Sequence, residues 1–267
     1  MKKGSCTFSS DYRRPAMVHI GIGIDRNAER VIESLASASK SNRITIFSKT
    51  DIPGTPYDII VGDNAEEELI RALFEGRIDA AVRGTLPANA VMKLLKEYGH
   101  VKSLKRIALL ETQAGTRFLL APVGVDEGWT REEKEEFVGY ARKIASAIGL
   151  SEKTAILSGG RLGDIGRHPV VDRTIEDAEV VAEKTGADHM EILIEDAVKD
   201  HGIIIAPDGI SGNLVFRTLA LLGGGRAHGA PVANLSRIFV DTSRASSDYS
   251  NAVFLASALA DYKRELK

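Results

Sequence analysis

The stretches IIIAPDGISGNLVFRTLALLGG (residues 203–224) and VDTSRASSDYSNAVFLASAL (residues 240–259) decide the fold. Each reads as a buried apolar strand that runs through a turn rich in glycine or serine into a helix. Such a turn presents free backbone N–H groups and hydroxyls at a helix start, where hydrogen bonding and the helix dipole both favour an anion. In the second turn Arg244 lies beside Ser243. The two turns together predict a shared phosphate or acyl-phosphate site.

Apolar runs alternate with amphipathic stretches along the rest of the chain. Strands that are apolar throughout, in alternation with helices, predict an α/β protein with largely parallel sheets. Ligands of such sheets bind outside the carboxyl ends of the strands, so we expect the site in the turns that follow strands. Strands are expected at residues 17–23, 43–47, 58–62, 78–82, 106–111, 117–124 and 154–160, and helices at residues 25–39, 64–77, 87–99, 131–148, 170–186 and 191–200.

The composition fits a soluble globular protein, with 43% hydrophobic and 27% charged residues. A net charge of −2 gives no basis for non-specific nucleic-acid binding. The apolar run AVFLASALA is too short to cross a bilayer, so no membrane association is expected. Cys6 is the only cysteine, which excludes an internal disulfide and makes a cytoplasmic location the default. The six histidines are scattered without ligand spacing, so no metal site is expected.

The turn VRGTLPAN follows the strand expected at 78–82 and places Arg83 at the strand end, with Thr85 two residues on. The planar guanidinium of an arginine gives two parallel hydrogen bonds to a phosphate or carboxylate, which suits substrate binding in a cleft. The alternative is an ordinary loop arginine on the surface.

The loop LSGGRLGDIGRHP (residues 157–169) contains four glycines and precedes a helix. Such a loop can be mobile and close over an anion, which makes Ser158, Gly159 and Arg161 candidate substrate-binding residues. It lacks the Gly-Lys-Ser/Thr ending of a Walker loop and the Gly-x-Gly opening of a dinucleotide fingerprint. His168 is a candidate general acid or base, and the alternative is a histidine with no role beyond the loop.

In the turn PDGISGN, Ser211 is expected to cap the following helix. Capping leaves two further features of this helix start unexplained. Gly212 would let a ligand approach the backbone closely, and Asn213 can donate and accept hydrogen bonds at once. We therefore expect all three residues to bind substrate.

In the turn TSRASSDYS, serine hydroxyls surround Arg244. A phosphoryl or acyl oxygen would be neutralised and hydrogen-bonded there, so Ser243 and Arg244 are candidate catalytic residues. Asp248 could accept a proton from an incoming nucleophile. The alternative for Asp248 is the ordinary acidic residue at a helix N-terminus.

The segments GRIDAAVRGTLPANAVMKLL, KTAILSGG, PDGISGN and DTSRASSDYS follow one another in the order seen in a known family. They resemble the phosphate acetyltransferase and phosphate butyryltransferase family. The resemblance implies a two-domain, three-layer α/β/α fold related to isocitrate and isopropylmalate dehydrogenases, with the active site in the cleft between the domains. The first domain would comprise residues 1–121 and 235–267, and the second residues 122–234. A homodimer and the use of coenzyme A are also implied.

Within that group, the segments RHPVVDRTIEDAE and RIFVDTSRA are most similar to the Mtx subunit X proteins of methanogenic archaea. Those proteins are labelled as methyltransferase-related. The resemblance implies a pterin-type one-carbon carrier as an alternative to coenzyme A, and a partner in a methyltransferase complex.

In the family, a Ser-Arg pair binds the acyl phosphate. The resemblance implies that Ser243 and Arg244 form this pair here. Where the family has an aspartate that is proposed to deprotonate the coenzyme A thiol, this chain has Ser250. Two hypotheses follow. The chain is a group-transfer enzyme that acts on a phosphorylated, acylated or one-carbon-bearing anion, or it is a binding or regulatory subunit that kept the fold and lost catalysis. A dehydrogenase dependent on metal and NAD is a weaker third hypothesis, because neither acidic metal ligands nor an adenine loop is found.

Overall fold

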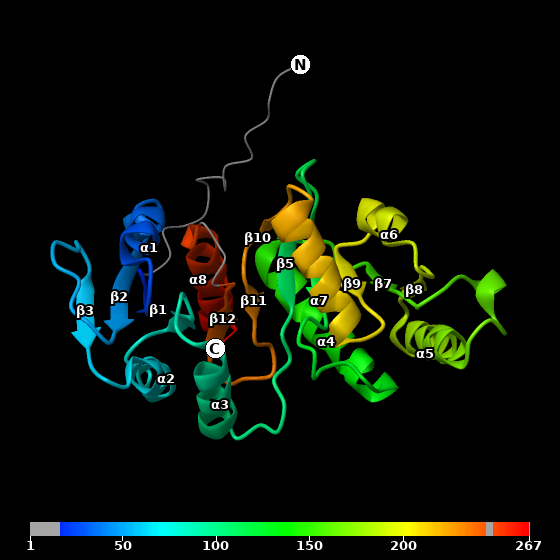
Figure 1. The fold of residues 1–267 in the computed structure, drawn as a ribbon, viewed down its shortest axis with the longest axis horizontal. Helices are drawn as coiled ribbons and strands as arrows, with labels where there is room; N and C mark the ends of the chain where they lie inside the picture. Colours follow the sequence, from blue (N-terminus) through cyan, green and yellow to red (C-terminus); the bar gives the residue numbers. More distant parts are fainter. Residues whose placement is uncertain (1–16, 244–247, 267) are drawn as a thin grey trace, which may run out of the picture.

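The computed structural model describes residues 17–243 and 248–266. It contains two six-stranded sheets, and helices pack on both faces of each. Figure 1 shows the two sheets side by side, with the blue and cyan N-terminal strands in one and the green and yellow strands in the other. The two-domain α/β architecture with mostly parallel sheets, expected from the sequence, is confirmed.

The first sheet has the strand order β11-β12-β4-β1-β2-β3, and its neighbours are parallel except for β11 and β12. Helices α2 and α3 cover one face, and α1 and α8 cover the other. Its elements are β1 (Val18–Ile24), α1 (Ala28–Leu35), the 3₁₀ turn η1 (Ala38–Lys40), β2 (Asn42–Ser48), β3 (Asp58–Val61), α2 (Ala65–Glu75), β4 (Ala80–Val82), α3 (Ala88–Gly99), β11 (Ala230–Pro231), β12 (Ile238–Asp241) and α8 (Ser250–Glu265).

The second sheet has the order β10-β5-β6-β9-β7-β8, in which the first two pairings are antiparallel and the rest parallel. Helices α4 and α5 cover one face, and α6 and α7 cover the other. Its elements are β5 (Ala108–Glu111), β6 (Arg117–Ala121), α4 (Arg131–Ile148), β7 (Thr154–Ile156), the 3₁₀ turn η2 (Leu162–Asp164), α5 (Pro169–Thr185), β8 (Asp188–His189), α6 (Ile194–Asp200), β9 (Ile203–Ile205), α7 (Gly209–Arg217), the π-helical turn η3 (Thr218–Leu222) and β10 (Arg226–Ala227).

Two features tie the sheets together. Helices α4 and α8 contact each other, so that one apolar core runs from the first sheet to the second. The chain at residues 226–232 also pairs with both sheets, since β10 pairs with β5 and β11 pairs with β12. Between them, the N–H of Leu109 donates to the carbonyl of Gly229 (2.9 Å). This crossover strand forms the wall between the two halves.

Sheet membership differs from the domain division expected from the sequence. Strands β5 and β6 precede residue 121 but belong to the second sheet, and β11 precedes residue 235 but belongs to the first. The sheets therefore divide the chain near residues 100–107 and 228–229. The Gly- and Pro-rich stretch 121–130 is the loop between β6 and α4, within the second half, and its composition reflects a tight turn instead of a linker.

Local signals explain where several elements begin and end. Thr130 caps α4, because its hydroxyl accepts the N–H of Glu133 (3.2 Å). Strand β6 ends at Ala121 because the next residue, Pro122, has no N–H to donate to a ladder. Among the helices of the described chain, none combines the length and apolar character needed to span a lipid bilayer.

Candidate functional site

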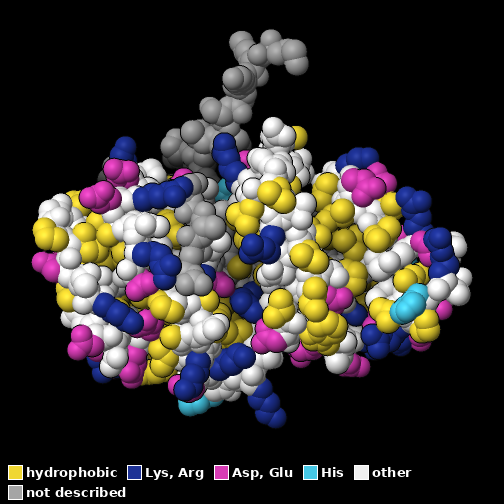
Figure 2. Space-filling model, viewed as in Figure 1, with side chains coloured by type: hydrophobic (Ala, Val, Ile, Leu, Met, Phe, Trp, Pro, Cys, Tyr) yellow, Lys and Arg dark blue, Asp and Glu magenta, His cyan; other side chains and the backbone are white. Residues whose placement is uncertain are grey.

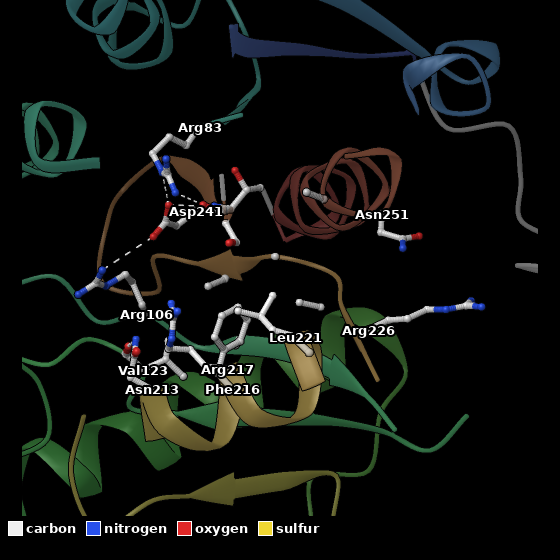
Figure 3. A pocket seen from close by; sticks show the side chains of 18 of the residues that line it. Arg83, Arg106, Val123, Asn213, Phe216, Arg217, Leu221, Arg226, Asp241 and Asn251 are labelled. Carbon is white, nitrogen blue, oxygen red and sulfur yellow. Dashed lines mark hydrogen bonds and ion pairs between the residues drawn. The ribbon is translucent and has the colours of Figure 1, made fainter. Parts of the chain in front are cut away.

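A cleft of about 880 Å³ lies between the two halves of the molecule. It is bounded by the turns after β4 and β12, by α7 and η3, by the crossover strand and by the start of α8 (Figure 3). The residues after β4 and β12 stand at the carboxyl ends of parallel strands, where ligands of such sheets bind. Four of the predicted site residues line it, namely Arg83, Asn213, Ser243 and Asp248.

Arg83 reaches the cleft, but all three nitrogens of its guanidinium already bind the protein. The side chain is buried, and its Nε pairs with the carboxylate of Asp241 at the end of β12. Its Nη1 donates to the carbonyl of Leu86 (2.7 Å), and its Nη2 donates to the carbonyl of Thr242. Arg83 therefore joins the ends of β4 and β12.

Arg106 also lines the cleft, and it was not predicted as a site residue because it falls within an expected strand. Its Nε donates to the carboxylate of Glu127 (2.6 Å), and its Nη1 lies 3.8 Å from Asp241. Glu127 is only 2% exposed, and burial raises its pKa although the Arg106 guanidinium favours the charged form. The pairs Arg83–Asp241 and Arg106–Glu127 thus form a largely neutralised ion network at one end of the cleft.

One face of α7 and η3 forms a cleft wall. Asn213, Phe216, Arg217, Ala220 and Leu221 line the cleft, and their spacing places them on a single helical stripe. Two charged residues, Arg217 on this wall and Arg226 on the neighbouring crossover strand, were not predicted from the sequence. A polar Asn and Arg at positions i and i+4 of an otherwise apolar stripe would have been the signal.

Arg217 and Arg226 supply the exposed positive charge of the cleft. Arg217 is exposed and makes no ion pair with a carboxylate in the described parts of the chain. The side chain of Arg226 is 73% exposed and lies 4.0 Å from Glu111. That carboxylate is already bound to Arg117 (2.9 Å), so Arg226 is only weakly neutralised.

The turn before α8 contributes Ser243 and Asp248 to the cleft, whereas Arg244 lies outside the described residues. The Asp248 carboxylate accepts the N–H (2.8 Å) and the hydroxyl (2.6 Å) of Ser250. Asp248 therefore caps the start of α8, which is the structural alternative weighed for it, while its side chain still faces the cleft. The hydroxyl of Tyr249 donates to the carbonyl of Ser243 (3.3 Å), and this hydrogen bond stabilises the turn.

In the turn before α7, the predicted cap at Ser211 is wrong. Asp208 is the N-cap, and its carboxylate accepts the N–H (2.8 Å) and the hydroxyl (3.1 Å) of Ser211. Gly212 is required by packing, because a Cβ there would lie 1.9 Å from the carbonyl oxygen of Pro122. Asn213 donates to the carbonyl of Val123 (2.8 Å). Of the three residues predicted in this turn, Ser211, Gly212 and Asn213, only Asn213 lines the cleft.

Thr85 is buried and organises the loop after β1. Its hydroxyl accepts the N–H groups of Asp25 (2.8 Å) and Arg26 (3.2 Å) and donates to the carbonyl of Arg26 (3.1 Å). It is not among the residues that line the cleft. The structure therefore places Thr85 behind the site, as a support for the loop.

The loop at residues 157–169 also lies away from the cleft lining. It leads into α5, at the outer edge of the second half in Figure 1. The buried hydroxyl of Ser158 bonds to the carbonyl of Gly160 (2.8 Å) and to Nε2 of His189 (2.9 Å). His168 caps α5, because its Nδ1 accepts the N–H of Val170 (3.2 Å).

The backbone N–H groups of this loop, which were expected to bind an anion, are bonded to the side chains of the chain itself. The N–H of Gly159 donates to Thr174 Oγ1 (2.8 Å), that of Arg161 to Asp164 Oδ2 (2.9 Å), that of Leu162 to Glu191 Oε1 (2.8 Å) and that of Gly166 to Asp172 Oδ1 (2.8 Å). The loop is held in one conformation by these bonds. Within the described residues, no group of three or more His, Cys, Asp and Glu side chains is arranged to hold a metal ion.

Solved structures with the same architecture include phosphotransacylases. The branched-chain phosphotransacylase of Enterococcus faecalis covers 91% of this chain and 99% of its own, with 17% identity and a TM-score of 0.73. A phosphotransacetylase of Streptococcus pyogenes covers 92% and 94%, with 16% identity and a TM-score of 0.69. At this identity the likeness shows the fold alone.

The sequence relatives are proteins of methanogens. The chain is 39% identical to the Mtx subunit X protein of Methanosarcina barkeri over 262 residues, which are 94% of this chain and 97% of the relative. It is 40% identical to the corresponding protein of Methanosarcina mazei over 264 residues, 95% of this chain and 94% of the relative. Both carry a provisional methyltransferase name, and no family model matches the chain. The chain therefore belongs to the family of the Mtx subunit X proteins, built on the phosphotransacylase fold.

Proposed function

We propose that this chain binds a small anionic molecule in the cleft and takes part in transferring a phosphoryl, acyl or one-carbon group. The observation that carries the proposal is the pair Arg217 and Arg226, which give an enclosed cleft at strand carboxyl ends an exposed positive charge. Arginine binds phosphate and carboxylate through paired, charge-assisted hydrogen bonds.

The turn at 242–248 supports group transfer in the same cleft. Ser243 and Asp248 line it, and the resemblance adds Arg244 as the residue that would polarise the transferred group. With an acyl phosphate, the nucleophile forms a bond to the acyl carbon, and the bond to the phosphate oxygen breaks with its electron pair. The proton of the nucleophile passes to the carboxylate of Asp248. Coenzyme A or a pterin would be the acceptor or donor of the group.

The second candidate function is ligand binding without turnover, as a subunit of a methyltransferase complex. It is supported by the contacts of Asp248, one oxygen of which is held by the backbone and hydroxyl of Ser250. This carboxylate oxygen is therefore already occupied by contacts within the turn, which favours a structural part for Asp248. The names of the relatives, which describe them as subunits, support a partner protein.

Isothermal titration with phosphate, acetyl phosphate, coenzyme A and a reduced pterin tests the proposal. We expect at least one of them to bind and Arg217→Gln to weaken its binding about tenfold, the effect of one charge-assisted contact. The matched control is Arg173→Gln on α5, which removes an exposed arginine outside the cleft lining and should leave the affinity unchanged.

A turnover assay with each donor and acceptor pair then separates the two candidates. Group transfer predicts product formation that falls in Asp248→Asn, whereas a binding subunit predicts none in the wild-type protein. If none of the four compounds binds the wild-type protein, both candidates fail.

A further inference from the structure

The two weakly neutralised arginines of the cleft lie at opposite ends of one apolar stretch. Figure 3 shows Arg217 on one side of Phe216 and Leu221, and Arg226 on the other. All four residues line the cleft. Arg217 ends α7, Leu221 belongs to η3, and Arg226 begins β10, so consecutive elements of the chain build the row in order.

Apart from Asp248, whose carboxylate accepts hydrogen bonds from Ser250, the remaining charges of the cleft are largely cancelled within the protein. Asp241 pairs with Arg83 and approaches Arg106, and Glu127 binds Arg106 from the other side. Arg226 has Glu111 at 4.0 Å, but that carboxylate also accepts hydrogen bonds from Arg117 (2.9 Å) and His228 (3.0 Å). The positive charge open to a ligand is therefore concentrated at the two ends of the row.

The middle of the row offers no hydrogen-bonding side chain. Phe216 is half-buried, Leu221 is 43% exposed, and Ala220 lies between them on the same helical stripe. Across the cleft, the small side chains of Ala230 and Ala252 line it, together with the polar side chain of Asn251. The wall formed by Phe216, Ala220 and Leu221 offers a polar group no hydrogen-bond partner, whereas methylene groups would gain from burial against it.

The helix geometry at this place is itself unusual. Residues 218–222 form a π-helical turn, closed by the N–H of Gly223 donating to the carbonyl of Thr218 (2.8 Å). Such turns are rare and occur mostly at functional sites, because they cost stability that an ordinary helix would keep. The turn displays Leu221 toward the cleft between the two arginines.

We infer that the cleft is built for an elongated molecule with two anionic groups joined by an apolar segment. One anionic group binds Arg217, the apolar segment lies over Phe216 and Leu221, and the other group binds Arg226. This inference rests on the proposed function, and it specifies the class of ligand that the same cleft takes.

Calorimetric titration with two matched probe series tests it: α,ω-alkane bisphosphates of increasing chain length, and the alkyl monophosphates of the same lengths. We expect the best bisphosphate to bind about tenfold more tightly than its monophosphate, because it gains one further arginine contact. Affinity should pass through a maximum with chain length, since only one length spans both arginines.

Arg226→Gln should abolish the preference for bisphosphates, because Arg217 alone then remains to bind a phosphate group in the row. Folding is preserved in this variant because Glu111 keeps Arg117 and His228 as partners. Arg173→Gln on α5 serves as the control and should retain the full preference. Leu221→Ser should flatten the dependence on chain length.

The outcomes distinguish the two proposals. Equal affinity for bisphosphates and monophosphates in the wild-type protein, or a preference that survives Arg226→Gln, overturns the inference and leaves the proposed function standing. If neither series binds, and the four compounds tested above do not bind either, the proposed function itself fails.

Discussion

The cleft and the loop at residues 157–169 both follow strands of an α/β sheet, and both carry arginines, glycines and hydroxyls. The loop leaves the side chain of Arg161 exposed but uses its backbone donors within the fold, whereas the cleft leaves two arginine side chains open to a ligand. In the loop, the backbone N–H groups of Gly159, Arg161, Leu162 and Gly166 are all bonded to side chains of the same chain. In the cleft, Arg217 and Arg226 project from a wall whose backbone is already satisfied within a helix and a strand.

The difference shows that residue types at a strand end do not by themselves make a binding site. What matters is whether their donors are used by the fold, because a donor engaged within the protein must be released before it can bind a ligand. The same distinction applies inside the cleft, where Arg83 is engaged and Arg217 is not. On the face of the molecule drawn in Figure 2, basic side chains lie among hydrophobic ones near the centre.

Among these variants, Asp241→Ala should give the largest loss in the free energy of unfolding. Its carboxylate neutralises Arg83, whose side chain is only 5% exposed, so its loss leaves a buried charge without its partner. We expect a loss of about 3 kcal/mol in the free energy of unfolding, measured by urea denaturation. Asp164→Ala in the loop is the control, and its much smaller effect should reflect an exposed pair with Arg167. Similar losses in the two variants would contradict the assignment of Arg83 to structure.

Gly212→Ala should come next. A Cβ at this position would meet the carbonyl oxygen of Pro122 at 1.9 Å, and a backbone oxygen cannot move aside cheaply. We expect a loss of about 2 kcal/mol in unfolding free energy, typical of overpacking. Gly163→Ala in the loop is the matched control, since nothing lies within 4 Å of its added Cβ. A tolerated Gly212→Ala would instead return Gly212 to the role of a ligand-facing glycine.

The sequence predicts the fold well because strand and helix periodicity are local properties. The alternation of strands and helices and the cap at Thr130 follow from patterns within a few residues. The crossover strand at 226–232 could not be found in this way, because its short pairings β10 and β11 depend on strands far away in the chain. For the same reason the sequence could not show that β5 and β6, which precede residue 121, join the second sheet.

The site was harder to predict because it depends on which donors remain free. Arg83 and Arg217 have the same side chain, and only the fold brings Asp241 to one of them. Ser158 and Thr85 likewise have hydroxyls suited to an anion, and both are buried in contacts with their own loops. The helical stripe that contains Asn213 and Arg217 was visible in the sequence, since it needs only the period of a helix.

The cleft and the loop can also be compared through their histidines. His228 lies beside the cleft, and a pH titration tests its contribution to stability, whereas His168 lies in the loop. Burial lowers the pKa of His228 below its usual value, although Glu111 partly offsets this. The folded protein therefore favours the neutral imidazole, and protonation favours the unfolded chain. The stability that depends on neutral His228 should be fully present above about pH 6.5, the pKa of histidine in the unfolded chain. It should be lost as the pH is lowered through the pKa of His228 in the folded protein.

His228→Gln should make that decrease shallower, as measured by urea denaturation between about pH 7.5 and about pH 5.5, a window above the usual range of carboxylates. Because Glu111 offsets part of the burial cost, we expect a smaller effect than that of Gly212→Ala. An unchanged slope in His228→Gln would show that this histidine does not contribute to the acid sensitivity.

His168→Ala should give the smallest effect, and it decides whether the loop has a catalytic part. Its Nδ1 caps α5 by accepting the N–H of Val170, so its loss should lower the unfolding free energy by about 0.5 kcal/mol. His168→Asn should restore stability, because asparagine is a good N-cap but cannot act as a general acid or base. Ligand affinity and any turnover should remain at wild-type values in both variants. A loss of turnover in His168→Asn, with stability intact, would mean that the loop reaches the bound ligand after all and that its internal hydrogen bonds are released in the working protein.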